Sequence, residues 1–191
     1  MEELIKEIKD SVPLSLEAED YLISISKEKI VPKGSVLIRQ GQVVKNTFFV
    51  SAGCLRSYCT DKNGKENTLL FAIKDWWISD YIAIHTDELA TLTVECLTES
   101  KVIEFNAKEL DGIHSLFPEF EPYQRHNLER HVVSLHRRIL NQLQLSAADR
   151  YDLFLKQYPE IEQNTRNFHI ASYLGITQQS LSRIRAEKAR K

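Results

Sequence analysis

The stretch NFHIASYLGITQQSLSRIR, residues 167–185, decides the fold of the C-terminal part of this chain. Apolar or small residues recur in it at the spacing of two short helices; they are Ile170, Ala171, Leu174, Ile176, Leu181 and Ile184. Gly175 interrupts the pattern where the first helix must end, and glycine most easily takes the left-handed conformation of a C-cap. Thr177 then stands where the second helix needs an N-cap. The stretch therefore predicts a helix-turn-helix.

The second predicted helix carries polar and basic side chains on the face that does not pack on the first helix. Glutamine amides pair with adenine, arginine forks pair with guanine, and hydroxyls and cations bind phosphate. We expect these residues to contact DNA: Thr177, Gln178, Gln179, Ser182, Arg183, Arg185 and Lys188. The alternative is an ordinary αα-hairpin whose polar face is only solvated.

The distribution of charge favours the DNA-binding interpretation. Residues 166–191 contain six basic residues and one acidic residue, a net charge of +5, whereas the whole chain of 191 residues carries −2. The first 165 residues therefore carry −7. A basic end on an acidic body is typical of a nucleic-acid-binding segment, although a solvated basic terminus is the alternative.

A long helix without glycine is predicted in the segment EPYQRHNLERHVVSLHRRILNQLQL, residues 121–145. Its apolar positions step by four and three residues, which is the seam of a coiled coil. We expect a dimer interface at Leu128, Val132, Leu135, Ile139 and Gln142, with Leu143 continuing the apolar edge. The alternative is a helix packed on its own domain. A further helix is expected after it, with Ser146 as N-cap and a stop before Pro159.

The first 120 residues read as helices followed by short strands. Helix-like spacing extends over residues 1–29, and from Ile30 short β-rich runs alternate with turns such as DKNG at 61–64, which predicts a hairpin. Another tight turn is expected at Thr98–Ser100, and helices resume near Ala107. Short strands with frequent turns predict a small antiparallel barrel or jelly roll.

Several classes of function lack support in the sequence. No nucleophile elbow, P-loop or paired carboxylates occur, so we do not expect an enzyme. Three cysteines without a CxxC pair fit reduced thiols in the cytoplasm, and neither they nor the scattered histidines have metal-ligand spacing. We therefore expect no metal and no identified cofactor. No apolar run is long enough to span a membrane, and the N-terminus lacks the features of a signal peptide.

The order of barrel, long helix and helix-turn-helix resembles the catabolite activator/Fnr (Crp/Fnr) family of bacterial transcription regulators, over almost the whole chain. The phrases KGSVLIRQGQ, FFVSAGCLRSY and DKNGKE are similar to that family's cyclic-nucleotide-binding-type barrel, and the C-terminal part is similar to short-tailed regulators of the Bacteroidetes type. The resemblance implies an α+β fold with a sensor barrel at 1–120, a dimerisation helix at 121–145 and an all-α DNA-binding domain at 146–191. Gln178, Gln179 and Arg183 match the three base-contacting positions of the family.

The family's ligand cassette is only partly present. It holds a Gly-Glu pair and an Arg-Ser pair, and the matching positions here are Ser79-Asp80 and Ala90-Thr91. Because the arginine is missing, a cyclic phosphate would have no countercharge, and we expect no cyclic AMP or GMP to bind. Another small effector could use the residues around the equivalent pocket: Trp76, Trp77, Ser79, Asp80, Tyr81, Ala90 and Thr91. Alternatively, the two tryptophans only fill the barrel core.

The sequence therefore predicts a cytoplasmic homodimeric transcription regulator that reads a pseudo-palindromic site, with duplex DNA, a second copy and RNA polymerase as candidate partners. A β-hairpin wing, which the family usually adds after the recognition helix, is not recognisable, so backbone contacts are expected from Lys188, Arg190 and Lys191. The alternative is a small-ligand sensor that has lost DNA binding and acts through a protein partner.

Overall fold

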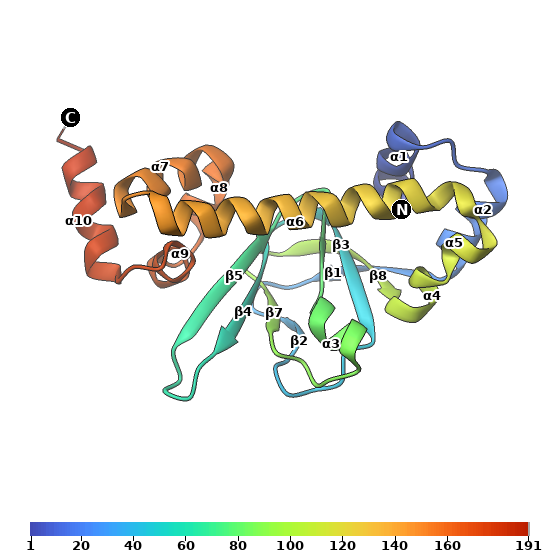
Figure 1. Ribbon diagram of the computed structural model, residues 1–191, viewed down its shortest axis with the longest axis horizontal. Helices are drawn as coiled ribbons and strands as arrows, with labels where there is room; N and C mark the ends of the chain where they lie inside the picture. The colour runs from blue at the N-terminus through green and yellow to red at the C-terminus, as the bar shows by residue number, and fades with distance from the viewer. Residues whose placement is uncertain (191) are drawn as a thin grey trace.

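The computed structural model describes residues 1–190, and Lys191 lies outside them. Figure 1 shows a β-barrel alongside one long helix, with short helices gathered at each end of that helix. The barrel strands are β1 (Ser26–Val31), β2 (Val36–Ile38), β3 (Asn46–Ala52), β4 (Leu55–Thr60), β5 (Glu66–Ala72), β6 (Trp76–Ile78), β7 (Thr93–Cys96) and β8 (Ser100–Asn106). They form two antiparallel sheets in the orders β1-β8-β3-β6 and β2-β7-β4-β5. The predicted antiparallel jelly roll is confirmed.

The helices lie before, within and after the barrel. Before and within it are α1 (Glu2–Ser11), α2 (Leu16–Ser24) and α3 (Tyr81–Thr86). After β8 follow α4 (Ala107–Asp111), α5 (Ile113–Leu116) and the short 3-10 helix η1 (Pro118–Phe120). The long helix is α6 (Glu121–Gln144), and beyond it lie α7 (Ala147–Gln157), α8 (Pro159–Asn164), α9 (Asn167–Leu174) and α10 (Gln178–Lys188).

The expected helical region over residues 1–29 is wrong beyond Ser24. From Ser26 the chain is strand β1, which pairs with β8 from Ser26 opposite Phe105 to Val31 opposite Ser100. The helix-like spacing near Ile25 is overridden because this six-residue ladder satisfies the backbone groups between two strands. Helix α8 was not expected either, and it begins at the proline that ends α7.

Side chains on neighbouring strand positions belong to different cores. In β3, Phe49 packs with Leu4 and Ile8 of α1 outside the barrel, whereas Phe48 and Val50 belong to the barrel interior. The same alternation separates Trp77, in the outer core, from Trp76, which packs against the inner one. This follows from the two-residue period of a strand. The expectation that both tryptophans surround one barrel pocket is therefore wrong.

Strand β5 matters for the position of the C-terminal helices. It follows β4 through the predicted hairpin, in which Gly64 has φ of +79° and the N–H of Asp61 donates to the Lys65 carbonyl at 2.9 Å. The hairpin prediction is confirmed. Because β5 is the last strand in its sheet, one side of its backbone has no strand partner. Helices of the C-terminal part lie against that side, as the contacts between α9 and β5 described below establish.

Candidate nucleic-acid interface

The predicted helix-turn-helix is confirmed in its local detail. Gly175 ends α9 in the left-handed conformation, with φ of +68°, and its N–H donates to the Ser172 carbonyl at 3.1 Å. The Thr177 side chain caps α10 by accepting from the Ser180 N–H at 3.1 Å. Leu181 and Ile184 of α10 are buried in the core of this domain.

The N-terminal half of α10 presents a free polar surface. Gln178, Gln179, Ser182 and Arg183 are exposed, and so is the capping residue Thr177. Within residues 1–190, the side chains of Gln178, Gln179, Ser182 and Arg183 make no hydrogen bond or ion pair with the rest of the chain. Their donors and acceptors are therefore available for another molecule, as a recognition helix requires.

Arg185 and Lys188 do not share this freedom, because both side chains pair within their own domain. For Arg185 this corrects the expectation that it projects outward, whereas Lys188 is exposed. Arg185 is half-buried, and its guanidinium contacts Tyr151 at 3.0 Å, Glu162 at 2.9 Å and Asn167 at 2.6 Å. Lys188 forms an ion pair with Asp152 of α7 and lies over the Tyr151 ring. These two cations hold α10 to its own domain. Arg190 is exposed, and Lys191 lies outside the described residues.

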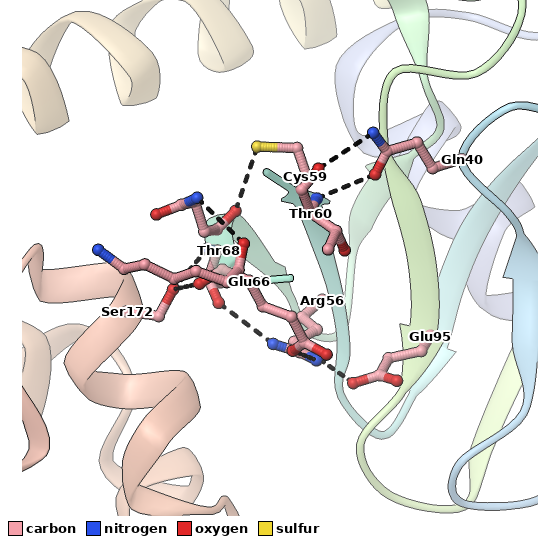
Figure 2. A network of polar contacts seen from close by, with 10 residues as sticks. Gln40, Arg56, Cys59, Thr60, Glu66, Thr68, Glu95 and Ser172 are labelled. Carbon is pink, nitrogen blue, oxygen red and sulfur yellow. Dashed lines mark hydrogen bonds and ion pairs between the residues drawn. The ribbon is translucent and has the colours of Figure 1, made fainter. Parts of the chain in front are cut away.

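The first helix of the pair is attached to the open edge of the barrel. The Ser172 hydroxyl accepts a hydrogen bond from the Thr68 N–H at 2.7 Å and donates one to the Glu66 carbonyl at 2.8 Å, as Figure 2 shows. From α6, the Arg138 guanidinium donates to the Thr68 carbonyl at 2.8 Å. These contacts satisfy backbone groups of the edge strand β5 that would otherwise lack partners.

A buried arginine lies beneath this attachment. Arg56 of β4 is only 1% exposed, and Figure 2 shows its guanidinium between the carboxylates of Glu66 and Glu95. It stacks on Tyr58, 3.9 Å from the ring centroid, and lies 5.6 Å from the Phe168 ring of α9. Two carboxylates compensate one buried cation, which offsets the cost of removing the charge from water.

Aromatic side chains extend the contact between the barrel and the helix-turn-helix domain. Phe71 of β5 lies 5.9 Å from Phe154, 5.8 Å from Tyr158 and 5.1 Å from Tyr173, measured between ring centroids. Burial raises the pKa of the Tyr173 and Tyr158 hydroxyls above their usual value. One hydrophobic core therefore spans the barrel edge and the C-terminal helices, so that the orientation of α10 relative to the barrel is defined by packing.

The apolar seam of α6 is largely exposed within residues 1–190. Leu128, Val132, Leu135 and Ile139 are exposed by 38–56% and lie on one face of the helix. Leu143 continues this face and is 77% exposed. An exposed apolar stripe of this length is typical of a protein–protein interface.

Gln142 does not belong to that stripe, which corrects its assignment to the seam. Its amide donates to the Tyr173 carbonyl at 3.4 Å, and a Cβ at Gly175 would lie 3.0 Å from its Oε1 atom. Gln142 therefore contacts the turn of its own helix-turn-helix. One residue further along, Leu143 takes the seam position, because a step of four residues from Ile139 keeps the same helical face.

The residues expected around a barrel ligand do not form one pocket. Asp80 is fully buried, and its carboxylate accepts from the N–H groups of Ala83, Thr91 and Leu92 and from the Thr91 hydroxyl. It caps α3 and fixes the backbone at residues 91–92, so its oxygens are already occupied. Ser79 donates to the Asn46 carbonyl at 2.8 Å, and Ala90 is buried.

The aromatic members of that set lie in two other places. Trp77 and Tyr81 line a cavity outside the barrel, between α3, α4 and the beginning of α6. The Trp77 indole donates to the Tyr123 hydroxyl at 3.0 Å, and burial raises the pKa of Tyr81 to about 12. Trp76 instead lines a cleft between α6 and α7. Adjacent residues of a strand face opposite sides, so the separation of Trp76 from Trp77 follows from the sequence once residues 76–78 are assigned to a strand.

No group of three or more histidine, cysteine, aspartate or glutamate side chains in residues 1–190 is arranged to hold a metal ion. No helix in the same residues has the length and apolar character needed to cross a bilayer.

The chain is similar to known proteins over most of its length. Residues 28–115 match the cyclic nucleotide-binding domain. The transcriptional activator protein FnrA of Stutzerimonas stutzeri is 24% identical over 188 residues, which cover 91% of this chain and 76% of FnrA.

Solved structures share the same architecture. A transcriptional regulator assigned to the Crp/Fnr family from Eubacterium rectale superposes with a TM-score of 0.74 at 17% identity, over 93% of this chain and 85% of that one. The c-di-GMP-responsive global regulator CLP of Xanthomonas campestris gives a TM-score of 0.72 at 12% identity, over 92% of both chains. FixK2 of Bradyrhizobium japonicum gives 0.72 at 14% identity, over 85% of this chain and 84% of that one. The chain therefore contains a region similar to the cyclic nucleotide-binding domain, and its jelly roll, long helix and helix-turn-helix together have the fold of these solved regulators.

Proposed function

We propose that the protein is a homodimeric transcription regulator that binds a pseudo-palindromic DNA site through α10. The observation that carries the proposal is the free polar face formed by Gln178, Gln179, Ser182 and Arg183, on a helix whose other side is buried. Such a helix lies in a major groove with its N-terminal residues at the base edges. We place the protein in the cytoplasm, with RNA polymerase as a candidate further partner.

The apolar stripe of α6 supports the dimer. Two copies joined along this stripe would bury Leu128, Val132, Leu135, Ile139 and Leu143 against each other. A two-fold axis along α6 would present two recognition helices to successive major grooves, about 34 Å apart. The symmetry of the site would then follow from the symmetry of the protein.

We infer further that the barrel does not hold a cyclic nucleotide in the family's manner. The carboxylate of Asp80 is saturated by four intramolecular donors. Thr91 supplies no charge for a phosphate, and it is itself bound to Asp80. An effector of this protein would therefore bind elsewhere in the fold.

A selection experiment tests the DNA-binding proposal. The purified full chain is incubated with a library of random duplexes, and bound sequences are recovered over several rounds. We expect enrichment of a site with two inverted half-sites whose centres are about one helical turn apart. Binding of all sequences with equal affinity, or of none, would contradict the proposal and favour a regulator that acts through a protein partner.

A further inference from the structure

A basic cleft lies between the long helix and the helix-turn-helix domain. It is formed by α6, by α7 and by the end of α9, with Trp76 at the barrel end, and its volume is about 280 Å³. Four of its lining residues are arginines, Arg130, Arg137, Arg138 and Arg150, and none is an aspartate or glutamate.

The charges of these arginines are largely uncompensated. Arg138 donates to the carbonyls of Thr68 and Tyr173, and Arg150 donates to the carbonyls of Leu145 and Leu174. Neutral carbonyls orient a guanidinium without neutralising it. Two other arginines complete the set. Arg130 alone has a carboxylate partner, Glu7 at 3.4 Å, whereas Arg137 is exposed and has no ion-pair partner among residues 1–190.

Burial also removes polar groups of this cleft from water. Arg138 is substantially buried, and desolvation lowers the pKa of its guanidinium from the usual value. Two donors of cleft residues, the Arg138 Nε and the Trp76 indole Nε1, are buried without any acceptor in the described chain. Buried donors without acceptors are rare in native proteins, because each loses the hydrogen bond that it makes with water in the unfolded chain.

The cleft remains open when the seam is covered. On an α-helix, Arg130, Ser134, Arg137 and Asn141 share one face, and the seam around Ile139 lies on the opposite face. Dimerisation along the seam therefore leaves one such cleft in each copy. Its walls are the dimer helix on one side and α7 and α9 on the other.

We propose that this cleft binds a small phosphorylated molecule. Four arginines and no carboxylate line it, which gives the cleft a net positive charge that fits an anion. A phosphate monoester offers three acceptor oxygens and close to two negative charges, and planar guanidinium forks match that arrangement better than a single carboxylate does. Leu153, Phe154 and Tyr173 provide apolar surface for the remainder of such a molecule. Bound there, it would bridge α6 to the helix-turn-helix domain.

Phenyl phosphate is a suitable probe, titrated into the full chain at constant ionic strength without DNA. The two indole N–H signals are followed by NMR and assigned with Trp76→Phe. We expect saturable binding that moves the Trp76 signal and not that of Trp77. Absence of saturable binding, or shifts at Trp77 only, would overturn the proposal. Because no DNA is present, the result is independent of the proposed DNA-binding function.

Two arginine variants of α6 distinguish binding at this specific cleft from non-specific electrostatic attraction of the phosphate. Arg137→Gln should weaken phenyl phosphate binding by about tenfold or more, the usual effect of losing one charge-assisted hydrogen bond. Arg125→Gln makes the same change of charge on the same helix, at an exposed residue that pairs with Glu121 and Glu129 outside the cleft, and should leave binding unchanged. Equal losses in both variants would overturn the proposal.

Benzoate provides the matched ligand control, since it has the same ring and one negative charge. It should bind at least about tenfold more weakly than phenyl phosphate if the phosphoryl group is what the cleft recognises. Equal affinity would contradict the assignment. If duplex DNA displaced phenyl phosphate and lost affinity on Arg137→Gln, the cleft would instead be a contact for the DNA backbone, and the proposal would be wrong.

Discussion

The hydroxyl of Ser172 lies between two backbone groups of β5, accepting from the N–H of Thr68 at 2.7 Å and donating to the carbonyl of Glu66 at 2.8 Å. One serine on the first helix of the helix-turn-helix thus covers the open edge of the barrel. Helix α10 is positioned relative to the barrel through this contact and the aromatic core beside it. The same hydrogen bonds thus join the two domains and cover the edge strand β5, which would otherwise be open to pairing with other chains.

Ser172→Ala should loosen this attachment. It removes two hydrogen bonds and leaves the Thr68 N–H without its acceptor, which we expect to lower the free energy of unfolding by about 1–3 kcal/mol. Urea denaturation measures the loss, and hydrogen exchange should be faster at the Thr68 amide. Ser182→Ala deletes the same hydroxyl from the exposed face of α10 and should have no effect on stability. A wild-type exchange rate at Thr68 in Ser172→Ala would contradict the role assigned to this contact.

Arg183→Ala should weaken specific DNA binding by about 1–3 kcal/mol, the usual contribution of a bidentate arginine–guanine contact. The side chain is exposed and has no partner within residues 1–190, so its loss should not destabilise the fold. A mobility-shift titration on the selected site measures the change. Arg39→Ala removes the same charge from an exposed position on the barrel and should bind DNA normally. Equal affinity of wild type and Arg183→Ala, with unchanged base preference, would count against the interface.

Ile139→Asp should convert the protein to a monomer. It places a carboxylate in the middle of the apolar seam, where a partner helix could not compensate the charge. Sedimentation equilibrium should show halving of the mass, and DNA affinity should fall by at least about tenfold because two half-sites no longer act together. Gln144→Asp, on another side of the same helix, is the control. A dimeric Ile139→Asp variant would show that the seam is not the interface.

His169 should make the helix-turn-helix domain sensitive to acid. Burial lowers the pKa of its imidazole to about 3, and the cations of Arg56 and Arg166 add to the effect. The folded state therefore holds this side chain neutral, whereas the unfolded chain binds a proton near the ordinary value of about 6.5. Its contribution to stability is complete above that value and is lost progressively as the pH falls toward 3.

The corresponding measurement compares urea midpoints at pH 7.5 and pH 5. Wild type should lose stability over this interval, and His169→Gln, which cannot be protonated, should lose less. His126→Gln changes an exposed histidine of α6 and should retain the wild-type dependence. An identical pH dependence in His169→Gln and wild type would disprove the role of His169.

The local parts of the fold could be predicted from the sequence because their causes are local. Gly175 and Thr177 end one helix and begin the next through their own backbone preferences and side-chain caps. The hairpin at 61–64 depends on residues that tolerate its turn, and the seam from Leu128 to Ile139 follows from spacing on one helix. For the same reason the free face at Gln178 and Arg183 could be located without a structure.

The tertiary structure alone decided which neighbours each side chain has. Arg185 was expected at the DNA, but Glu162 and Tyr151 lie within its reach only because α7 and α8 fold back on α10. The sequence makes Asp80 a candidate ligand contact, but in the folded chain the N–H groups of residues 91–92 occupy its carboxylate. The spacing of apolar residues indicates which face of a helix or strand is apolar. It does not indicate which distant segment of the chain packs on that face. The arginine cleft and the attachment of Ser172 to β5 both depend on such distant segments.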